Sequence, residues 1–390
     1  MEMESGSEAG LRSKSDLEQY RSMAIRLHEV PGVGWHSIRK AIDGELWRLG
    51  EQVEEKHFAA AGFQKAQAQA AAARMRQPLA APGSSYMKAQ ERGAAVITPF
   101  DERYPRYLKG IPQPPWVLYA LGQIELLQRP AIAVVGTRHP TAYGRHSAAS
   151  FAEQLSARGV TVISGLARGV DGIAHEAALK GPGSTVAVLA CGVDTCYPSE
   201  NRQLYREIER RGLLLSETPI GAKLHPGMFP LRNRIIAGLS IGTLVVEAAV
   251  KSGSLITAHQ ALDMSREVFA VPGPISSPKS AGTNELIVHG AKLVSHAEHI
   301  IEEFRYRIPE LLRIVRRHER STAVEEAAAE RNGTDAEERR VVELLRDSPL
   351  SVDDLHRLTG IPFGHLSALL INLCIKRKIE QQSGSFYIGL

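Results

Sequence analysis

Long apolar segments are missing from this chain. No apolar run approaches the roughly 18 residues that a helix needs to span a bilayer. The first 15 residues are polar and rich in glycine, serine and glutamate, and they lack the apolar core of a signal peptide. Such a composition favours a disordered tail over residues 1–15. We therefore expect a cytoplasmic protein that contacts no membrane.

Cysteine is also scarce. The chain has three cysteines, Cys191, Cys196 and Cys374, which lie in or beside apolar runs. An odd number of cysteines in or beside apolar runs argues against a disulfide framework and agrees with a cytoplasmic protein. The spacing of Cys191 and Cys196 is not that of a zinc knuckle, and the fourteen histidines form no HExxH pattern. We therefore expect no metal site.

The motifs of common nucleotide-dependent enzymes are missing as well. No GxxxxGK[ST] segment occurs, which argues against P-loop ATP hydrolysis. No GxGxxG follows the first apolar strand of the central region, and no GxSxG nucleophile elbow is present. The loops described below offer donors and cations but no evident pair of nucleophile and base. These features favour a binding protein without a cofactor over an enzyme.

The overall charge is only mildly basic. A net charge of +4 and a sequence pI near 8.9 permit a polyanionic partner but do not require one. At 390 residues the chain exceeds the usual size of one hydrophobic core, so we expect two or three domains.

Short apolar runs and helical patterns alternate through the middle of the chain. Most of the runs are rich in valine, isoleucine and leucine, as strands buried on both faces are. Strict alternation of such strands with helices predicts an α/β fold with a doubly wound parallel sheet. The order of the strands cannot be read from the pattern. The expected strands cover residues 131–136, 160–164, 185–191, 213–216, 243–247, 267–271 and 292–294. The expected helices cover residues 143–158, 171–180, 199–211, 230–239, 254–265 and 283–289.

Residues 16–92 show helical patterns and form a separate predicted domain. Residues 31–34 read Pro-Gly-Val-Gly and are followed by the basic Arg39 and Lys40. This element resembles a helix-hairpin-helix or SAM-like turn. In DNA-binding versions of such a hairpin, the N–H groups of the turn hold a backbone phosphate. The alternative is a plain helical turn in an accessory domain, because one hairpin supplies few phosphate contacts.

Residues 93–129 are rich in proline and in aromatic side chains. The proline density argues against regular secondary structure, whereas the aromatic residues argue for packing onto a neighbour. We expect an irregular lead-in segment that wraps onto the sheet domain, and we place the sheet domain itself within residues 93–300.

The loops that follow the predicted strands are where a site is expected, because ligands of such sheets bind at the carboxyl ends of the strands. The first loop ends in Arg138, whose planar guanidinium suits phosphate, and it leads into a helix N-terminus with free N–H groups. The second loop, residues 164–171, combines Arg168 with glycines that let the backbone approach a ligand closely.

Two further loops carry the same kinds of residue. The third places Phe229 beside Arg232, Asn233 and Arg234, which together offer a stacking face for a splayed base and donors for its phosphates. The fourth places Ser252, Gly253 and Ser254 at an expected helix start, a nest for an anion, with Lys251 beside it.

Each loop taken singly has a plainer interpretation. Glycine is common in turns, Arg168 could cap a helix, and Phe229 could belong to the core. Asp171 and His175, four residues apart, could pair on a helix surface. However, several strand ends repeat a cation with glycine or serine, and they must meet at one edge of the sheet. This repetition favours one shared anionic ligand.

The C-terminal part predicts a linker and a small third domain. Residues 301–334 are highly charged, and residues 335–390 predict three helices followed by a hairpin that turns at Ser383 and Gly384, which is the plan of a winged helix. The third helix would read the groove of a duplex, yet its N-terminal half carries almost no positive charge. Contact with a protein is therefore favoured over direct reading of a duplex.

An ordered series of motifs in the sheet domain resembles the DNA-processing protein DprA (Smf) family. The resemblance is continuous over roughly residues 95–300, and the flanking regions are similar to the helical and winged-helix domains of some members. The motifs are Gly136 to Arg138 with Tyr143 and Gly144, Ser164 to Asp171 with Ala174 and His175, Gly192 with Tyr197 and Pro198, Ser216 and Glu217, Phe229 to Arg234, Ser252 to Thr257, Val271 to Gly273, and Gly282 to Asn284.

This resemblance implies more than the residues alone do. It implies an extended Rossmann fold, a homodimer through that domain, and single-stranded DNA bound in a basic pocket. It further implies loading of the RecA recombinase onto incoming strands during natural transformation, without established catalysis. Carried over by position, Arg138 should hold phosphate and Phe229 should stack on a base, while Arg232, Asn233, Lys251 and Ser254 should line the pocket.

Two other functions compete with this interpretation. The first is a nucleotide-processing enzyme resembling the phosphoribohydrolases that were once called lysine decarboxylases, which carry a Pro-Gly-Gly-x-Gly-Thr-x-x-Glu loop. Here the nearest counterparts are Gly242, Thr243 and Glu247, without the Pro-Gly-Gly. The second is a transcription regulator that uses the winged helix, and the shortage of cations on its third helix argues against it.

Overall fold

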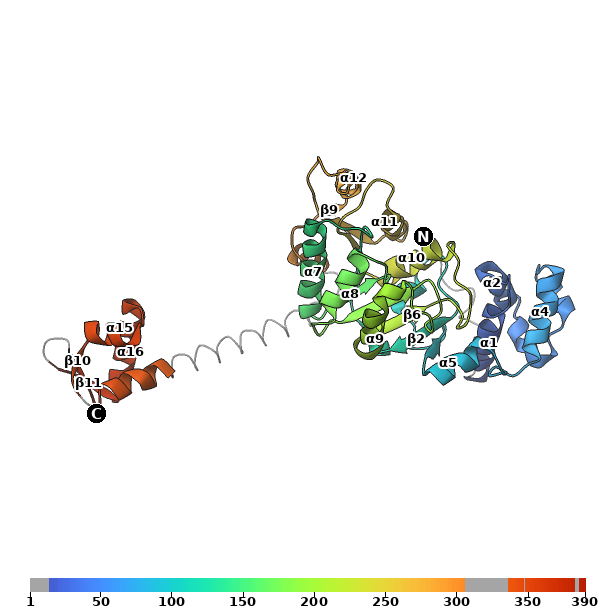
Figure 1. Cartoon of the computed structure of the whole chain (residues 1–390). Helices are drawn as coiled ribbons and strands as arrows, with labels where there is room; N and C mark the ends of the chain where they lie inside the picture. Colours follow the sequence, from blue (N-terminus) through green and yellow to red (C-terminus); the bar gives the residue numbers. More distant parts are fainter. Residues whose placement is uncertain (1–13, 306–335, 347, 383–385) are drawn as a thin grey trace. The chain divides into compact units, whose positions relative to one another are not determined.

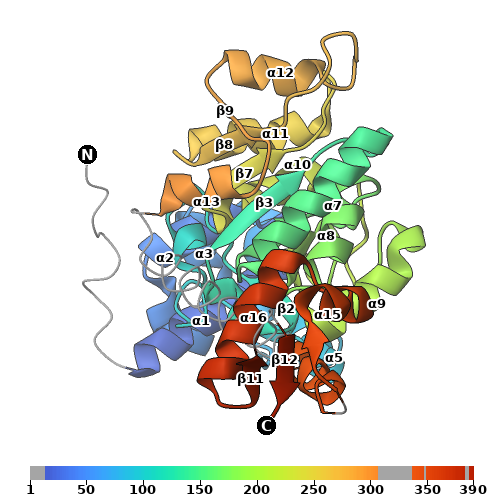
Figure 2. The ribbon, with the colours of Figure 1, turned by 90° about the vertical axis from the view of Figure 1, so that its left-hand side faces the viewer.

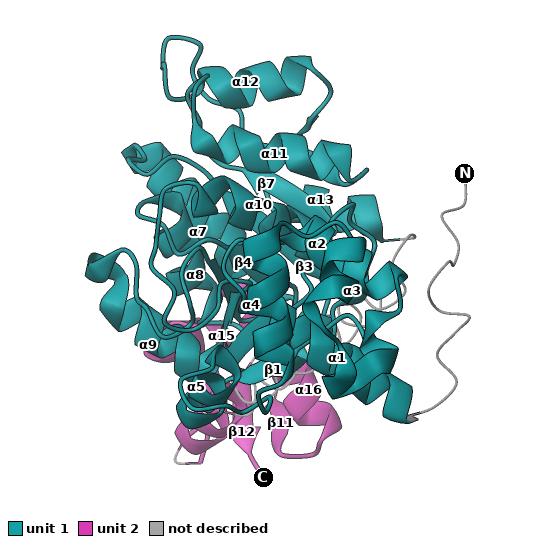
Figure 3. Cartoon of the chain, turned by 90° about the vertical axis from the view of Figure 1, so that its right-hand side faces the viewer, with its two compact units in different colours: residues 1–315 teal, residues 316–390 magenta. Residues whose placement is uncertain are grey.

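The computed structural model describes residues 14–305, 336–346, 348–382 and 386–390. The chain forms two compact units, residues 1–315 and 316–390, which are shown in two colours in Figure 3. Most of the predicted tail, most of the predicted linker and the predicted turn at Ser383 and Gly384 lie outside the described residues.

The first unit is built around a sheet of nine strands. Figure 1 shows this unit in blue to orange, with the helices α7, α8, α9 and α10 among those labelled in it. The strand order in the sheet is β1-β2-β6-β5-β4-β3-β7-β8-β9. In this order, all neighbouring strands between β6 and β9 are parallel. This confirms the predicted doubly wound α/β fold. The strands are β1 (Ala95–Ile97), β2 (Leu118–Gly122), β3 (Ala131–Val135), β4 (Thr161–Ser164), β5 (Thr185–Leu189), β6 (Leu213–Ser216), β7 (Gly242–Val245), β8 (Glu267–Ala270) and β9 (Lys292–Leu293).

Alternate residues of the strands feed cores on opposite faces of the sheet, as the period of two along a strand requires. Residues 131, 133 and 135 of β3 pack with α10 (Met228–Leu239), α11 (Gly253–Asp263) and α12 (Ala281–Val288). Residues 132 and 134 pack with α7 (Ala142–Ala157), α8 (Val170–Ala178) and α13 (Glu298–Phe304). Figure 2 shows α7 and α8 side by side on their face of the sheet. Because β3 lies between β4 and β7, the strand order reverses at β3. Ligands of doubly wound sheets bind beside such a reversal, at the carboxyl ends of the strands.

The lead-in segment is more regular than its proline content predicts. We expected irregular structure over residues 93–129, and this expectation was wrong, because β1 and β2 add two antiparallel strands to the edge of the sheet beyond β6. The prolines at positions 112, 114 and 115 precede β2, where they remove no donor from the strand ladder. The segment also contains α6 (Arg106–Lys109) and the short helix η3 (Ile124–Gln128).

The N-terminal residues are helical, as predicted. They form α1 (Lys14–His28), α2 (Trp35–Asp43), η2 (Leu46–Gln52), α3 (Glu55–Ala60), α4 (Lys65–Met75) and α5 (Ser85–Arg92). Their apolar side chains share one core with β2, β5, β6 and α9 (Arg202–Arg211), which η4 (Ser199–Asn201) precedes. The hairpin turn is tied to the lead-in segment because Trp35 Nε1 donates to the carbonyl of Pro114 at 2.7 Å. This part of the chain therefore packs directly onto the sheet.

The second unit confirms the predicted winged helix. After a helix over residues 336–344 come α15 (Val352–Thr359), α16 (Phe363–Ile375) and a sheet of β10 (Leu350–Ser351), β12 (Phe386–Gly389) and β11 (Ile379–Gln382). Ser351 caps α15 by accepting a hydrogen bond from the Asp354 N–H. Leu366, Leu369, Leu370 and Leu373 of α16 fill the core, as their spacing predicts.

No single helix within these described ranges is long and apolar enough to cross a membrane. The pair α15 and α16 reaches the required length and composition only when taken together, and it is bent by 113° at its break.

Candidate nucleic-acid interface

The loops after β3, β4 and β7 meet the first turns of α10 and α11 around a cavity of about 460 Å³, which we call the strand-end cavity. Seven of the ten predicted site residues line it, together with Gly136, Thr137, Ala167, Asp171 and Thr257. These seven are Arg138, Phe229, Arg232, Asn233, Ser252, Gly253 and Ser254. Pro230 falls in the first turn of α10, where its missing N–H leaves no intrahelical bond unmade. The volume is in the range of ordinary ligand sites.

Glycine is required where two of these loops approach their neighbours. Gly169 has a φ of 76°, and a Cβ there would lie 2.5 Å from the Thr137 carbonyl oxygen. At Gly165 a Cβ would lie 2.6 Å from the central carbon of the Arg232 guanidinium. The loop after β4 therefore lies tightly between the loop after β3 and the arginine of α10.

Arg232 forms the floor of the strand-end cavity and is 8% exposed. Its Nη1 donates to the carbonyl of Gly165 at 2.6 Å and also to the carbonyl of Val188, and its Nε donates to Asn233 Oδ1 at 3.2 Å. Burial lowers the pKa of Arg232, and the nearby Asp171 carboxylate opposes that effect. Much of its hydrogen-bonding capacity is therefore used inside the protein.

Asp171 and His175 are both buried, and each has its own partners. Asp171 Oδ2 accepts from the N–H groups of Gly165 and Ala167 at 3.1 and 3.4 Å. His175 Nε2 accepts from the Leu166 N–H at 3.2 Å, so its proton sits on Nδ1, which faces Thr185 Oγ1 at 2.7 Å. Burial lowers the pKa of His175 to about 3, and the charge of Arg232 adds to that effect. The imidazole is a neutral structural element of the loop after β4.

Two aromatic rings and one arginine form the exposed rim. Arg138 is exposed, and its guanidinium lies 5.9 Å from the ring centroid of the half-buried Phe229. Tyr197, which is also exposed, lies 5.6 Å from the same ring. A small cavity of about 40 Å³ beside them is lined by Arg138, Arg168, Tyr197, Phe229 and Arg232. Tyr197 was not among the predicted site residues, although its position just after a strand end, next to Pro198, is a usable signal.

The other three predicted residues lie at the border of the strand-end cavity or outside it. Arg168 is exposed and pairs with Glu200. Arg234 points away from the cavity and makes two bonds to the Glu217 carboxylate at 2.6 and 2.5 Å. Lys251 is exposed immediately before Ser252, which caps α11. Of these three cations, Lys251 and Arg168 remain accessible to a ligand.

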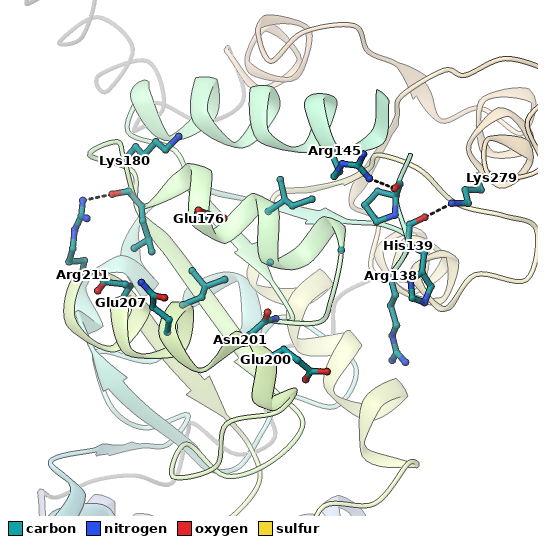
Figure 4. A pocket seen from close by; sticks show the side chains of 17 residues that line it. Arg138, His139, Arg145, Glu176, Lys180, Glu200, Asn201, Glu207, Arg211 and Lys279 are labelled. Atoms are coloured by element: carbon teal, nitrogen blue, oxygen red, sulfur yellow. Dashed lines mark hydrogen bonds between the residues drawn. The ribbon is translucent and has the colours of Figure 1, made fainter. Parts of the chain in front are cut away.

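A larger cavity of about 760 Å³ continues from Arg138 between α7, α8 and α9, and we call it the α7–α9 cavity (Figure 4). At one end Arg138, His139, Arg145 and Lys279 gather. Arg145 donates to the Pro140 carbonyl and Lys279 to the His139 carbonyl. The opposite end has mixed charge, with Lys180 and Arg211 near Glu176 and Glu207. The basic end therefore extends the positive rim of the strand-end cavity.

Glu247 follows β7 and lies at the reversal point of the sheet, behind these cavities. It is 2% exposed, and its carboxylate accepts from the N–H and Oγ1 of Thr141, both at 2.8 Å. The carboxylate thus occupies the start of α7, where a nucleotide phosphate sits in dinucleotide-binding sheets. This arrangement gives Glu247 a structural role and leaves it poorly placed to act on a substrate.

In the residues that the structure describes, no group of three or more His, Cys, Asp or Glu side chains could hold a metal ion.

In the winged helix, the exposed face of α16 includes Ile371 and Ile375, with Phe363 at its first turn. Apolar groups of this kind suit contact with a protein better than contact with phosphates.

Comparison with known proteins finds close relatives. A DNA processing protein DprA of Bacillus subtilis is 46% identical over 215 residues, which cover 55% of this chain and 72% of that protein. A protein Smf of Synechocystis is 35% identical over 322 residues, which cover 76% of this chain and 81% of that protein.

Two solved structures of relatives agree in fold. The DNA processing protein A of Streptococcus pneumoniae has a TM-score of 0.63 and 33% identity, and the match covers 75% of this chain and 98% of that one. The protein from Helicobacter pylori has a TM-score of 0.50 and 32% identity, with coverage of 54% and 95%, and that protein is described with a mode of single-stranded DNA binding.

Family profiles match part of each unit. The DprA winged helix domain matches residues 325–385. Because the profile of the DNA recombination-mediator protein A matches residues 95–305, more than half of the chain, this protein belongs to the DprA/Smf family of DNA recombination mediators, as its sequence motifs indicated.

Proposed function

We propose that the chain binds single-stranded DNA in the strand-end cavity and delivers the strand to a RecA recombinase during DNA uptake. The observation that carries the proposal is the rim formed by Arg138, Phe229 and Tyr197 above Arg232. An exposed guanidinium beside two accessible rings offers a base a face to stack on and its phosphate a charged donor.

A single strand fits this site better than a duplex does. The rings lie at the mouth of a recess, so only a base that is free of its pairing partner can reach them. The donors at the rim are guanidinium, hydroxyl and backbone groups, which recognise phosphate rather than the edge of one particular base. Binding should therefore depend little on sequence and strongly on salt.

No catalytic step is proposed. The carboxylate that a phosphoribohydrolase would use corresponds to Glu247, which is bonded to Thr141 and nearly inaccessible. Membership of a recombination-mediator family supports delivery of the strand to a recombinase. The winged helix, with its apolar α16 face, is proposed to contact protein rather than DNA.

Replacing Arg138 by alanine should weaken binding of a labelled single strand about tenfold or more, because one charge-assisted phosphate contact is lost. The slope of log affinity against log salt should become shallower by about 0.7. Fluorescence anisotropy over a salt series, with the matching duplex as competitor, measures both quantities.

The matched control is Arg210→Ala, which removes an exposed arginine of α9 that pairs with Glu207. It should change affinity little. If Arg138→Ala binds as tightly as the wild type at every salt concentration, the strand does not use this cavity. If the wild type prefers the duplex, the proposed function itself is wrong.

We also propose that two copies pair through the β9 edge of the sheet. Ile275, in the loop after β8, is 99% exposed, and Val288, at the end of α12, is 82% exposed. The loop is held against α12 because Asn284 exchanges hydrogen bonds with Gly273 at 3.2 and 3.0 Å. We infer that a second copy covers the side chains of Ile275 and Val288 and pairs with β9, which is the edge strand of the sheet.

The double variant Ile275→Asp, Val288→Asp should therefore be monomeric by light scattering at concentrations where the wild type is dimeric. In the dimer the two aspartate carboxylates would be buried at the interface, which carries a large free-energy cost. In the monomer the same positions are exposed, so the substitutions should change its stability little. Leu49→Asp, at an exposed apolar position on η2, is the control and should leave the mass unchanged. A dimer that persists in the double variant would place the interface elsewhere.

A further inference from the structure

A third cavity of about 460 Å³, which we call the hairpin cavity, lies between the N-terminal hairpin and the sheet. The hairpin contributes Val33, Gly34, Trp35 and His36, and the lead-in segment contributes Gln113 and Trp116. The far wall comes from the end of β6 and from α10, including Glu217, Leu231 and Arg234. On the near side, Trp35 and Trp116 are stacked with ring centroids 5.7 Å apart.

The arginine and glutamate side chains of this lining already have hydrogen-bond partners within the protein. Arg234 is paired with Glu217 by two hydrogen bonds and donates to the Gln113 carbonyl at 2.5 Å. Arg232 is engaged with the carbonyls of Gly165 and Val188. His28 lies 2.7 Å from the carbonyl oxygen of Glu217. A cavity with aromatic walls and paired charges suits a planar uncharged ring better than a phosphate.

The hairpin cavity and the strand-end cavity lie on different faces of the same helix, α10. Phe229, Asn233 and Ile236 face the strand-end cavity, whereas Met228, Leu231 and Ile235 face the hairpin cavity. These two sets lie roughly 130° apart around the axis of α10, as a rotation of about 100° per residue gives. Arg232 lines both cavities. The two cavities therefore share α10 as a wall.

We propose that the hairpin cavity is a second nucleobase site on the same strand. A strand held at Arg138 and Phe229 crosses the start of α10 and places a later base against Trp35, while its phosphates stay outside in solvent. This inference rests on the proposed function, because the first cavity supplies the phosphate contacts that bring the strand to the second. It gives the N-terminal hairpin a direct part in binding.

The test compares strands of increasing length, from about 4 to about 20 thymidines, a range that brackets common single-strand site sizes. Two glycines offer matched variants. Gly34 lines the hairpin cavity and Gly253 lines the strand-end cavity. A Cβ at either position meets nothing within 4 Å, and neither residue has a positive φ, so leucine fills one cavity without straining the backbone.

Gly34→Leu should leave the affinity for the shortest strands unchanged and weaken binding of the longest about tenfold, the value of one base stack. Gly253→Leu should weaken binding at every length. Leu231→Glu, at a 59% exposed position in the hairpin cavity, should act like Gly34→Leu. Its charge-matched control, Leu262→Glu, is on an exposed position of α11 and should have little effect.

If affinity depends on strand length in the same way for Gly34→Leu, Leu231→Glu and the wild type, the proposal of a second site is wrong. The first site is not affected by that result. Failure of the wild type to bind any single strand overturns the proposed function instead. Photo-crosslinking of strands with a 5-iodouracil at one position gives an independent readout. Crosslinks to Trp35 or His36 from the end distal to Arg138 support the proposal, and crosslinks confined to the strand-end cavity contradict it.

Discussion

Replacing Arg232 by alanine should lower the free energy of unfolding of the first unit by about 2–6 kcal/mol, because it leaves two buried carbonyl groups without a donor, each at a cost of about 1–3 kcal/mol. The variant leaves the Asp171 carboxylate buried beside no cation, and it removes the donor that the Gly165 and Val188 carbonyls share. Unpaired buried groups of this kind dominate the largest destabilising effects.

Urea unfolding followed by tryptophan fluorescence measures this loss. The three tryptophans, Trp35, Trp47 and Trp116, all belong to the first unit, so the winged helix does not contribute to the signal. Arg138→Ala is the control, because Arg138 is exposed, and its midpoint should match the wild type. Equal midpoints for Arg232→Ala and the wild type would show that the guanidinium is not needed to hold the loops.

The contrast between Arg138 and Arg232 marks the limit of what the sequence could predict about the site. Both residues follow predicted strands and both are arginines, so sequence alone treated them alike. Which carbonyls an arginine meets depends on how tightly neighbouring loops approach, and here the absence of a Cβ at Gly165 admits the Arg232 guanidinium. For Arg234 the deciding fact is the position of Glu217, which lies 17 residues earlier in the chain.

The regular parts of the fold were predictable for the opposite reason. The strands β3 to β8 are short, apolar and bounded by turns, so local pattern determines them. The antiparallel strands β1 and β2 were not predicted, because their pairing joins distant segments and because the nearby prolines argued against regular structure. The hairpin cavity could not be predicted either, since it depends on how the N-terminal hairpin packs onto the sheet.

Stability should fall as the pH is lowered through the range in which free histidine titrates, and His175 should account for a large share. Its pKa is about 3 in the folded protein, because burial disfavours the charged form, against about 6.5 in an unfolded chain. Between these values the unfolded state binds one proton that the folded state does not. The free energy of unfolding therefore rises with pH in this window.

The contribution of His175 amounts to about 2 kcal/mol between about pH 7 and about pH 5. The difference in urea midpoints between the wild type and His175→Gln should therefore narrow as the pH falls, because glutamine does not titrate. Burial raises the pKa of Asp171, which acts in the opposite sense at lower pH, but this contribution is common to both proteins and cancels in the comparison. If the urea midpoints of the wild type and His175→Gln instead change with pH in parallel, the His175 imidazole becomes protonated in the folded protein. The hydrogen bond from the Leu166 N–H to Nε2 is then not maintained.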